Sequence, residues 1–280
     1  MQAAVVDYQA SDAPAKFAES LHQTGFAVLK NHPIPPELFQ QVKKEWVKFL
    51  ASDEKLKIMY DRAACPQDGY FPTESAKGEV LDDLKEFYQV YPHGRMPSSV
   101  SESTWHLFHE LYKIGVDTLK WLDQNMPRDI HQKLSCHLEE MADPDIQTLL
   151  RIIHYPAQTG DEDEGALRAA DHEDINLITI LPAADEPGLE AQDRAGNWHE
   201  VPCDPGMIVV NAGNPLQMST EGYYKSTTHR VRNPSKERMH LPRYSFPLFL
   251  HCKGDVVLNT KTGFTAGDYL RERLVELGLA

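Results

Sequence analysis

The segment AADHEDINLITIL, residues 169–181, places a His-x-Asp pair directly before a β-prone run. In an extended chain, side chains at positions i and i+2 point to the same face, so His172 and Asp174 are expected to face the same way. A second histidine, His229, follows in another strand-like stretch. Two imidazoles and one carboxylate are the ligands of the facial triad that holds non-haem Fe(II) and leaves coordination positions open. We therefore predict an iron site formed by His172, Asp174 and His229.

A second i, i+2 pair, Arg243 and Ser245, lies on a strand-like stretch beyond His229. A guanidinium group binds a carboxylate through two parallel hydrogen bonds, and a neighbouring hydroxyl can add a third. The pair therefore predicts a carboxylate-binding site close to the metal.

A His-x-Asp pair alone is weak evidence, because about one match is expected by chance in a chain with 13 histidines. Its position on a predicted strand, with a second His and an Arg-x-Ser pair on later strands, makes the combination more specific. The segment His137-Leu138-Glu139 has similar ligand types at the same spacing. It falls in a helical pattern, where residues i and i+2 lie roughly 200° apart, so we exclude it as a metal-binding pair.

The composition argues against two classes of partner. The 280 residues carry a formal net charge of −14 and are 41% hydrophobic, and the pI is near 5.3. Binding to a phosphate backbone is driven by Lys and Arg, so neither nucleic acid nor an anionic membrane is an expected partner. The length suits one large domain or two small ones.

The cysteines lie far apart and form no Cys-x-x-Cys pair; they are Cys65, Cys136, Cys203 and Cys252. This spacing indicates neither a zinc ribbon nor a disulfide framework and fits reduced thiols. The first 14 residues contain no apolar run of signal-peptide length. No segment approaches the ~18 apolar residues of a membrane span. We expect a soluble, cytoplasmic protein.

Residues 1–145 are predicted to form a mainly helical N-terminal region. Helices are expected after Ser11 and Asp12 with Gly25 as the stop signal, after Pro35-Pro36, over residues 102–125, and around Ile130, Leu134 and Leu138, with a strand at residues 26–30. Residues 63–101 are rich in Pro, Gly and Ser, and we predict an irregular loop there, either a binding loop or a surface loop pinned by its aromatic side chains.

Residues 146–255 are predicted to form a β-rich core. Short β-prone runs at residues 149–153, 175–181, 207–210 and 243–250 are bounded by Pro, Gly, Asn and Asp, a pattern typical of a sandwich or jelly roll. Residues 256–280 should end in a helix over 265–279 that begins with a Thr265/Asp268 capping box. The fold class is therefore mainly β with flanking helices, in one structural unit.

Motifs along nearly the whole chain resemble the isopenicillin N synthase-like family of Fe(II)/2-oxoglutarate-dependent dioxygenases. The opening TGFAVLKNHPIP, residues 24–35, is similar to the family's "TGFF-x-x-x-NHGI", and DLKEF, residues 83–87, resembles its "DxKE-aromatic" segment. Matches to its core strands follow in order at residues 187–189, at Trp198, Pro202, Gly206, Asn211 and Gly213, and at residues 223–231.

This resemblance implies a distorted double-stranded β-helix, or jelly roll, with N-terminal helices packed outside and iron in the barrel mouth. It implies that His172, Asp174 and His229 bind Fe(II), and that Arg243, Ser245 and Tyr155 contact the distal carboxylate of the cosubstrate 2-oxoglutarate. An unidentified small-molecule substrate would be hydroxylated or desaturated with O2, with release of succinate and CO2. The sequence departs from the family pattern at Ile153, where many members have Asn, and at Pro33 and Asn214.

Two other hypotheses are left open by the residues. Isopenicillin N synthase itself has an Arg-x-Ser pair that binds its substrate's carboxylate, so an Fe(II) oxidase without 2-oxoglutarate has the same signature. A jelly-roll sensor or binding protein with a metal such as zinc would use the same ligands. The residues that line the substrate site are not identified by any pattern; the candidates by sequence order are Phe87, Tyr88, Arg151, His154 and Phe246.

Overall fold

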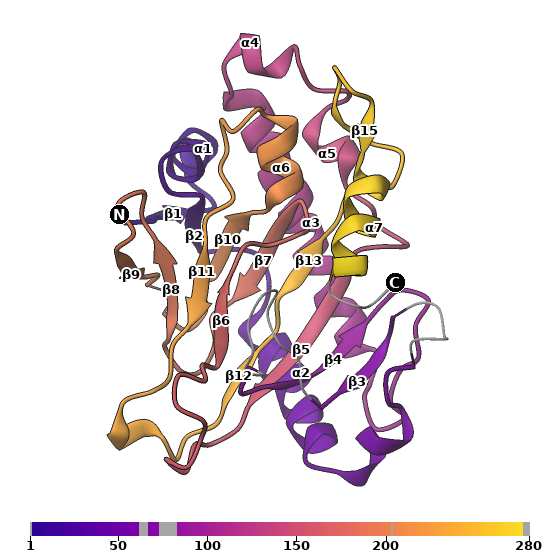
Figure 1. Ribbon diagram of the computed structural model, residues 1–280, viewed down its shortest axis with the longest axis vertical. Helices are drawn as coiled ribbons and strands as arrows, with labels where there is room; N and C mark the ends of the chain where they lie inside the picture. The colour runs from indigo at the N-terminus through magenta and orange to yellow at the C-terminus, as the bar shows by residue number, and fades with distance from the viewer. Residues whose placement is uncertain (1, 62–66, 73–82, 203, 277–280) are drawn as a thin grey trace.

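Two β-sheets form the framework of the molecule (Figure 1). The computed structural model describes residues 2–61, 67–72, 83–202 and 204–276. The larger sheet has nine strands in the order β1-β2-β10-β7-β13-β5-β4-β3, with β12 also paired to β5. The smaller sheet has the order β6-β11-β8-β9, and a separate pair is formed by β14 and β15.

The strands are short. Their bounds are β1 Ala4–Asp7, β2 Phe26–Lys30, β3 Gly69–Phe71, β4 Glu86–Val90, β5 Leu149–Tyr155, β6 Ala169–His172, β7 Ile178–Pro182, β8 Leu189–Gln192, β9 Trp198–Glu200, β10 Ile208–Ala212, β11 His229–Val231, β12 Arg243–Ser245, β13 Leu248–Leu250, β14 Val257–Asn259 and β15 Phe264–Thr265.

The N-terminal region contributes strands to both edges of the large sheet. β1 and β2 extend it beside β10, and β4 and β3 extend it beside β5. The first four residues of β2 are buried, which fits a strand covered on both faces. Residues 1–145 and 146–255 therefore share one sheet.

Three helices cover one face of the large sheet: α1 Ala13–Thr24, α2 Pro36–Leu50 and α3 Ser103–Asn125. α3 packs against β7 and β13. A Cβ atom at Gly115 in α3 would lie 2.5 Å from Cδ1 of Leu250, so the absence of a side chain lets this helix approach the sheet closely. The remaining helices are α4 Arg128–His131, α5 Leu138–Met141, α6 Asn214–Ser219 and α7 Ala266–Glu276, with short 3-10 turns at Asp53–Lys57 and Lys236–Arg238.

Several predicted elements are confirmed. The strand at residues 26–30 is β2, the Pro36 helix is α2, and the segment 102–125 is α3 apart from its first residue. Gly25 ends α1 with a φ of 74°, in the left-handed region that favours glycine. The Thr265/Asp268 capping box is also present, because each residue's backbone N–H donates to the other's side chain, at 3.2 and 3.1 Å.

Other predictions were wrong. The expected loop over residues 63–101 contains β3 and β4, because Tyr70 and Tyr88 pair across the two strands; residues 62–66 and 73–82 lie outside the described part. The helix expected around residues 130–138 is split into α4 and α5. The run 243–250 forms two strands, β12 and β13, since Pro247 between them has no N–H to donate to a ladder.

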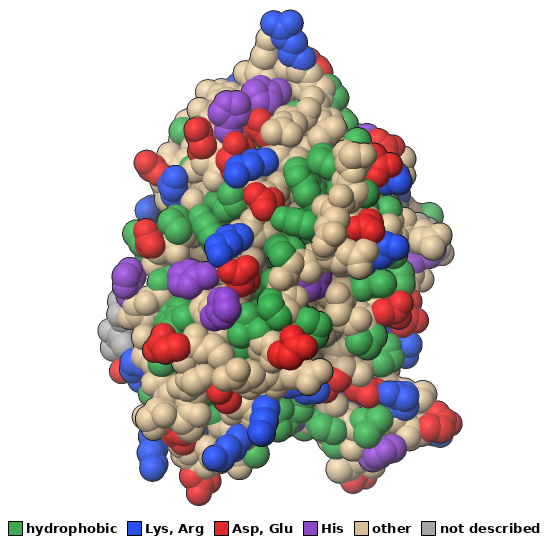
Figure 2. Space-filling model, turned by 180° about the vertical axis from the view of Figure 1, so that it is seen from behind, with side chains coloured by type: hydrophobic (Ala, Val, Ile, Leu, Met, Phe, Trp, Pro, Cys, Tyr) green, Lys and Arg blue, Asp and Glu red, His purple; other side chains and the backbone are tan. Residues whose placement is uncertain are grey.

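Acidic, basic and apolar side chains are interspersed on the face of the molecule shown in Figure 2. Among the described residues, no helix combines the length and the apolar character needed to span a membrane. Cys136 and Cys252 are free thiols, whereas Cys65 and Cys203 lie outside the described residues.

Candidate active site

The structure brings together the three residues predicted to bind iron. β6 and β11 pair antiparallel, with His172 directly opposite His229. Nε2 of His172 lies 3.9 Å from Oδ1 of Asp174, and Nε2 of His229 lies 3.7 Å from the same oxygen. The three ligand atoms all lie within 4.8 Å of one another. However, β6 ends at His172, so Asp174 reaches the cluster from the turn before β7 rather than from the same strand.

Backbone carbonyls hold both imidazole rings in place. Nδ1 of His172 donates to the carbonyl oxygen of Ala170 at 2.8 Å, and Nδ1 of His229 donates to that of Thr227 at 3.0 Å. A carbonyl oxygen can only accept, so the proton of each neutral ring is on Nδ1 and the lone pair is on Nε2. Such partners set the tautomer and the orientation of metal-binding histidines.

Two side chains orient the carboxylate of Asp174. Its Oδ2 accepts hydrogen bonds from Oγ1 of Thr179 at 2.5 Å and from Nδ2 of Asn211 at 2.8 Å. Oδ1 is thereby turned toward the two histidines. Gly213 lets the chain before β7 pass close to it, because a Cβ atom at Gly213 would lie 1.8 Å from the carbonyl oxygen of Asn176.

The electrostatics of the cluster favour the protonation states that bind a cation. Burial, followed by the neighbouring His229, lowers the pKa of His172 to about 4. Burial alone would raise the pKa of Asp174, but the two histidines and the hydrogen bonds from Thr179 and Asn211 lower it overall. Neutral imidazole and ionised carboxylate are the forms that ligate metals, so these residues fit Fe(II).

The predicted carboxylate anchor lies on the neighbouring part of the large sheet. In the β5–β12 pair, Arg243 faces Tyr155 and Ser245 faces Ile153, so these four side chains share one face. Arg243 and Ser245 are each 3% exposed. Nε of Arg243 donates to the carbonyl oxygen of Glu186 at 2.9 Å, and its guanidinium carbon lies 5.1 Å from the centre of the Tyr155 ring. The arginine fork is therefore fixed in position.

The β4–β5 register places the candidate lining residues on two different faces of the sheet. Phe87 pairs with Ile153, and Arg151 lies two residues before Ile153, so both share the face of the anchor. The guanidinium carbon of Arg151 lies 4.4 Å from the centre of the Phe87 ring. Tyr88 and His154 point to the opposite face, and Tyr88 packs there on Trp46 at 5.1 Å.

Phe246, the fifth candidate, is a buried member of the main hydrophobic core. His154 takes part in a charged cluster instead, because its Nδ1 lies 2.7 Å from Oε1 of Glu86 and its ring stacks on Tyr244 at 4.6 Å. Burial alone would raise the pKa of Glu86, but hydrogen bonds from His154, Lys55 and Tyr70 lower it to about 2.

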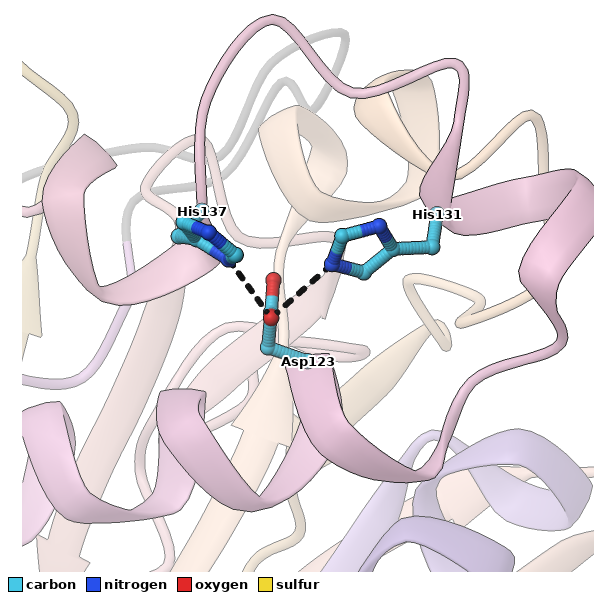
Figure 3. Close-up of side chains that lie close together, drawn as sticks. All are labelled: Asp123, His131 and His137. Atoms are coloured by element: carbon cyan, nitrogen blue, oxygen red, sulfur yellow. Dashed lines mark hydrogen bonds and ion pairs between the residues drawn. The ribbon is translucent and has the colours of Figure 1, made fainter.

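A separate His–Asp–His cluster lies where α3, α4 and α5 meet (Figure 3). Nε2 of His131 and Nδ1 of His137 lie 3.1 and 2.9 Å from the same oxygen, Oδ2, of the buried Asp123, and the backbone N–H of Leu138 donates to Oδ1 at 3.1 Å. Each of the three side chains therefore takes part in a hydrogen bond within the cluster. His137 precedes α5 as its N-cap and is not inside a helix as predicted, and its partner is Asp123 rather than Glu139.

Three residues around the site were missed by sequence reasoning: Thr179, Asn211 and Arg168. Thr179 and Asn211 hold Asp174 from β7 and β10, and no sequence spacing indicates that contact. Arg168 is a charged residue just before β6, and its 1% exposure could not be foreseen from the sequence.

Two family models match the chain. The model of the 2OG-Fe(II) oxygenase superfamily matches residues 146–252, and that of the non-haem dioxygenase in morphine synthesis N-terminal region matches residues 4–108. A solved putative oxygenase from Shewanella oneidensis has 44% sequence identity and a TM-score of 0.89, with all of both chains covered.

Two further relatives are more distant. A solved putative 2OG-Fe(II) oxygenase family protein from Caulobacter crescentus has 28% identity and a TM-score of 0.77, with 98% of each chain covered. Clavatol oxidase claD from Penicillium crustosum is 28% identical over 262 residues, which cover 80% of this chain and 76% of that protein.

The fold and the site define a non-haem iron oxygenase with a jelly-roll core. The chain belongs to the 2OG-Fe(II) oxygenase superfamily. It is an Fe(II)- and 2-oxoglutarate-dependent oxidoreductase that uses O2, which confirms the predicted family, fold class and cofactors.

Proposed function

We propose that His172, Asp174 and His229 hold the Fe(II) of this dioxygenase, and that Arg243, Ser245 and Tyr155 hold the distal carboxylate of 2-oxoglutarate. The substrate is a small molecule that is hydroxylated or desaturated. One observation carries the metal assignment: Nδ1 of both histidines and Oδ2 of Asp174 are already hydrogen-bonded, so Nε2, Nε2 and Oδ1 are directed toward one point.

The roles of the protein groups follow from their positions. When bound, Fe(II) and 2-oxoglutarate supply the oxidising chemistry, in which 2-oxoglutarate is converted to succinate and CO2. The two imidazoles and the carboxylate would hold the metal through three ligand atoms, Nε2, Nε2 and Oδ1. Arg243 offsets the charge of a carboxylate that would otherwise be costly to bury. Its Nε–Glu186 hydrogen bond sets the direction from which the cosubstrate is held.

The face shared by Phe87, Arg151 and Ile153 lies beside the carboxylate anchor along β5. We place the small-molecule substrate against this face. Tyr88 and His154 take no part in its binding, because their side chains occupy the other face of the sheet.

The test is an anaerobic optical titration of the metal-free protein with Fe(II) and then with 2-oxoglutarate. Wild-type protein is expected to develop the weak visible charge-transfer band of a keto acid chelated to Fe(II). His229→Ala should lose iron binding, and Arg243→Ala should keep iron but require far more 2-oxoglutarate. Arg273→Ala, which removes a half-buried arginine of α7 paired with Glu276 at 2.8 Å, is the control and should behave as wild type.

Iron binding by His229→Ala with wild-type affinity would refute the metal assignment. A normal 2-oxoglutarate titration in Arg243→Ala would refute the carboxylate anchor. If iron binds to wild-type protein but no band forms, the reading as an Fe(II) oxidase without 2-oxoglutarate replaces this one.

A further inference from the structure

Arg168 is a buried cation, and no carboxylate among the described residues forms a hydrogen bond or an ion pair with it. Its side chain is 1% exposed, and the residue lies directly before β6, the strand that ends at His172. Nη2 donates to the carbonyl oxygen of Leu241 at 2.9 Å. Nε and Nη1 are buried and have no hydrogen-bond partner among the residues that the structure describes. Leaving charged donors buried and unsatisfied is costly, so a ligand is expected to complete this group.

The position of Arg168 is fixed by its surroundings. Its backbone N–H donates to Oδ1 of Asn233 at 3.1 Å, and Nδ2 of Asn233 donates to the carbonyl oxygen of Ala166 at 2.7 Å. Gln158 donates to the same Asn233 oxygen at 2.9 Å. Arg168 is therefore held at both ends, by the hydrogen bond of its backbone N–H and by that of Nη2.

Arg168 lies beside the cosubstrate anchor. The carbonyl that it binds belongs to Leu241, two residues before Arg243. Burial and then the positive charge of Arg243 lower the pKa of Arg168, as expected for two neighbouring buried guanidinium groups. Two neighbouring buried guanidinium groups repel each other, and an anion that contacts both would relieve that repulsion.

Two acidic residues in this neighbourhood, Glu186 and Asp185, are engaged by other groups. The carboxylate of Glu186 binds Arg238 through two hydrogen bonds of 2.7 and 2.8 Å. Asp185 pairs with Lys43 at 2.8 Å and accepts from the backbone N–H of Tyr244 at 3.0 Å. Neither carboxylate hydrogen-bonds Arg168 or Arg243.

We propose that Arg168 is a second guanidinium contact for the distal carboxylate of 2-oxoglutarate, and that it acts together with Arg243. This inference rests on the proposed function of the site. A carboxylate has about four lone-pair positions on its two oxygens, enough for one arginine on each side and a hydroxyl. Arg168 is then a specificity residue, because it favours oxo acids with a second carboxylate over oxo acids that end in a methyl group.

The experiment compares Arg168→Leu with Arg168→Lys in the iron-loaded protein. The dissociation constant of 2-oxoglutarate is measured from the charge-transfer band under anaerobic conditions. A second titration uses 2-oxovalerate, which has the same chain length but a methyl group in place of the distal carboxylate. Arg168→Leu is expected to weaken 2-oxoglutarate binding by about 10- to 100-fold and to leave 2-oxovalerate binding within about twofold. Arg168→Lys keeps the charge without the fork and should recover part of the loss.

The outcomes separate this inference from the function on which it rests. If Arg168→Leu weakens both oxo acids equally, or neither, while Arg243→Leu weakens only 2-oxoglutarate, the role of Arg168 is refuted and the anchor stands. If Arg243→Leu also leaves 2-oxoglutarate binding unchanged, the anchor itself is refuted. Arg230→Leu, which removes an arginine paired with Glu190 at 2.9 Å, is the control for loss of charge. If Arg168→Leu does not fold, Arg168→Lys carries the same comparison.

Discussion

Removing the hydroxyl of Thr179 should weaken iron binding without changing any metal ligand. Thr179 is 3% exposed, and its Oγ1 donates to Oδ2 of Asp174 at 2.5 Å. Thr179→Val keeps the shape of the side chain and removes the donor to Asp174, together with the acceptor for Nδ2 of Asn176 at 3.0 Å. Asn211 still donates to the same oxygen at 2.8 Å, so the carboxylate keeps one of its two partners.

The expected magnitude follows from that partial loss. A hydrogen bond to a charged acceptor contributes about 1.5–3 kcal/mol, and the remaining partner places the cost at the lower end, at about 1.5–2 kcal/mol. Because about 1.4 kcal/mol corresponds to a factor of ten, Fe(II) should bind about 10- to 30-fold more weakly. Replacing a residue that hydrogen-bonds a metal ligand generally lowers metal affinity or activity by about 10- to 100-fold.

The measurement is the anaerobic Fe(II) dissociation constant, obtained by competition with a chelator and accompanied by a thermal melt. Thr148→Val is the matched control, since Thr148 is also fully buried and its hydroxyl also donates, to the carbonyl oxygen of Asp143. Both variants should lose similar stability, but only Thr179→Val should lose iron affinity. If a folded Thr179→Val binds Fe(II) as tightly as wild type, the orientation of Asp174 by Thr179 is not needed and the reasoning fails.

Three further outcomes concern stability. The lowered pKa of Glu86, about 2 against an ordinary 4.5, means that its stabilisation is present above pH 4.5 and is lost as the pH falls toward 2. Glu86→Gln should therefore cost about 3 kcal/mol at pH 7 and about half of that or less at pH 3 in urea unfolding, and an equal cost at both pH values would contradict the cluster. Asp123→Asn should cost about 2 kcal/mol of unfolding free energy at pH 7. Because the pKa of the Asp123 carboxyl is also lowered, the stability difference between this variant and the wild type should shrink below pH 3.8, the ordinary pKa. Gly213→Ala should lower the melting temperature by roughly 5 °C or more, while Gly254→Ala, whose added Cβ would meet nothing closer than 3.9 Å, should change it little; similar melting temperatures for the two would disprove the steric argument.

The residues proposed as triad and anchor could be recognised because the members of each pair are close in sequence. His172 and Asp174 are two residues apart, as are Arg243 and Ser245, and the facing strands then bring His229 opposite His172. The prediction that both members of the first pair lie in one strand was nevertheless wrong, because β6 ends at His172.

The supporting residues could not be predicted, because each contact joins elements that are distant in the chain. Asn211 reaches Asp174 only through the β10–β7 register, and Asp123 meets His131 and His137 only where two turns bring short helices back to α3. β3 and β4 were missed for a related reason. β4 is stabilised by pairing with β5, and β3 by pairing with β4, rather than by periodicity within residues 63–101.

The end of the first helix lies in direct contact with the loop that precedes His229. A Cβ atom at Gly25 would lie 2.3 Å from Oγ1 of Thr227, and that hydroxyl donates to the carbonyl oxygen of Thr24 at 3.0 Å. The carbonyl of Thr227 in turn holds the His229 ring. A change at the end of α1 is therefore expected to affect the position of His229, one of the proposed iron ligands. Spectroscopy of iron bound at the proposed site would then report on the docking of α1, which carries none of the proposed ligands.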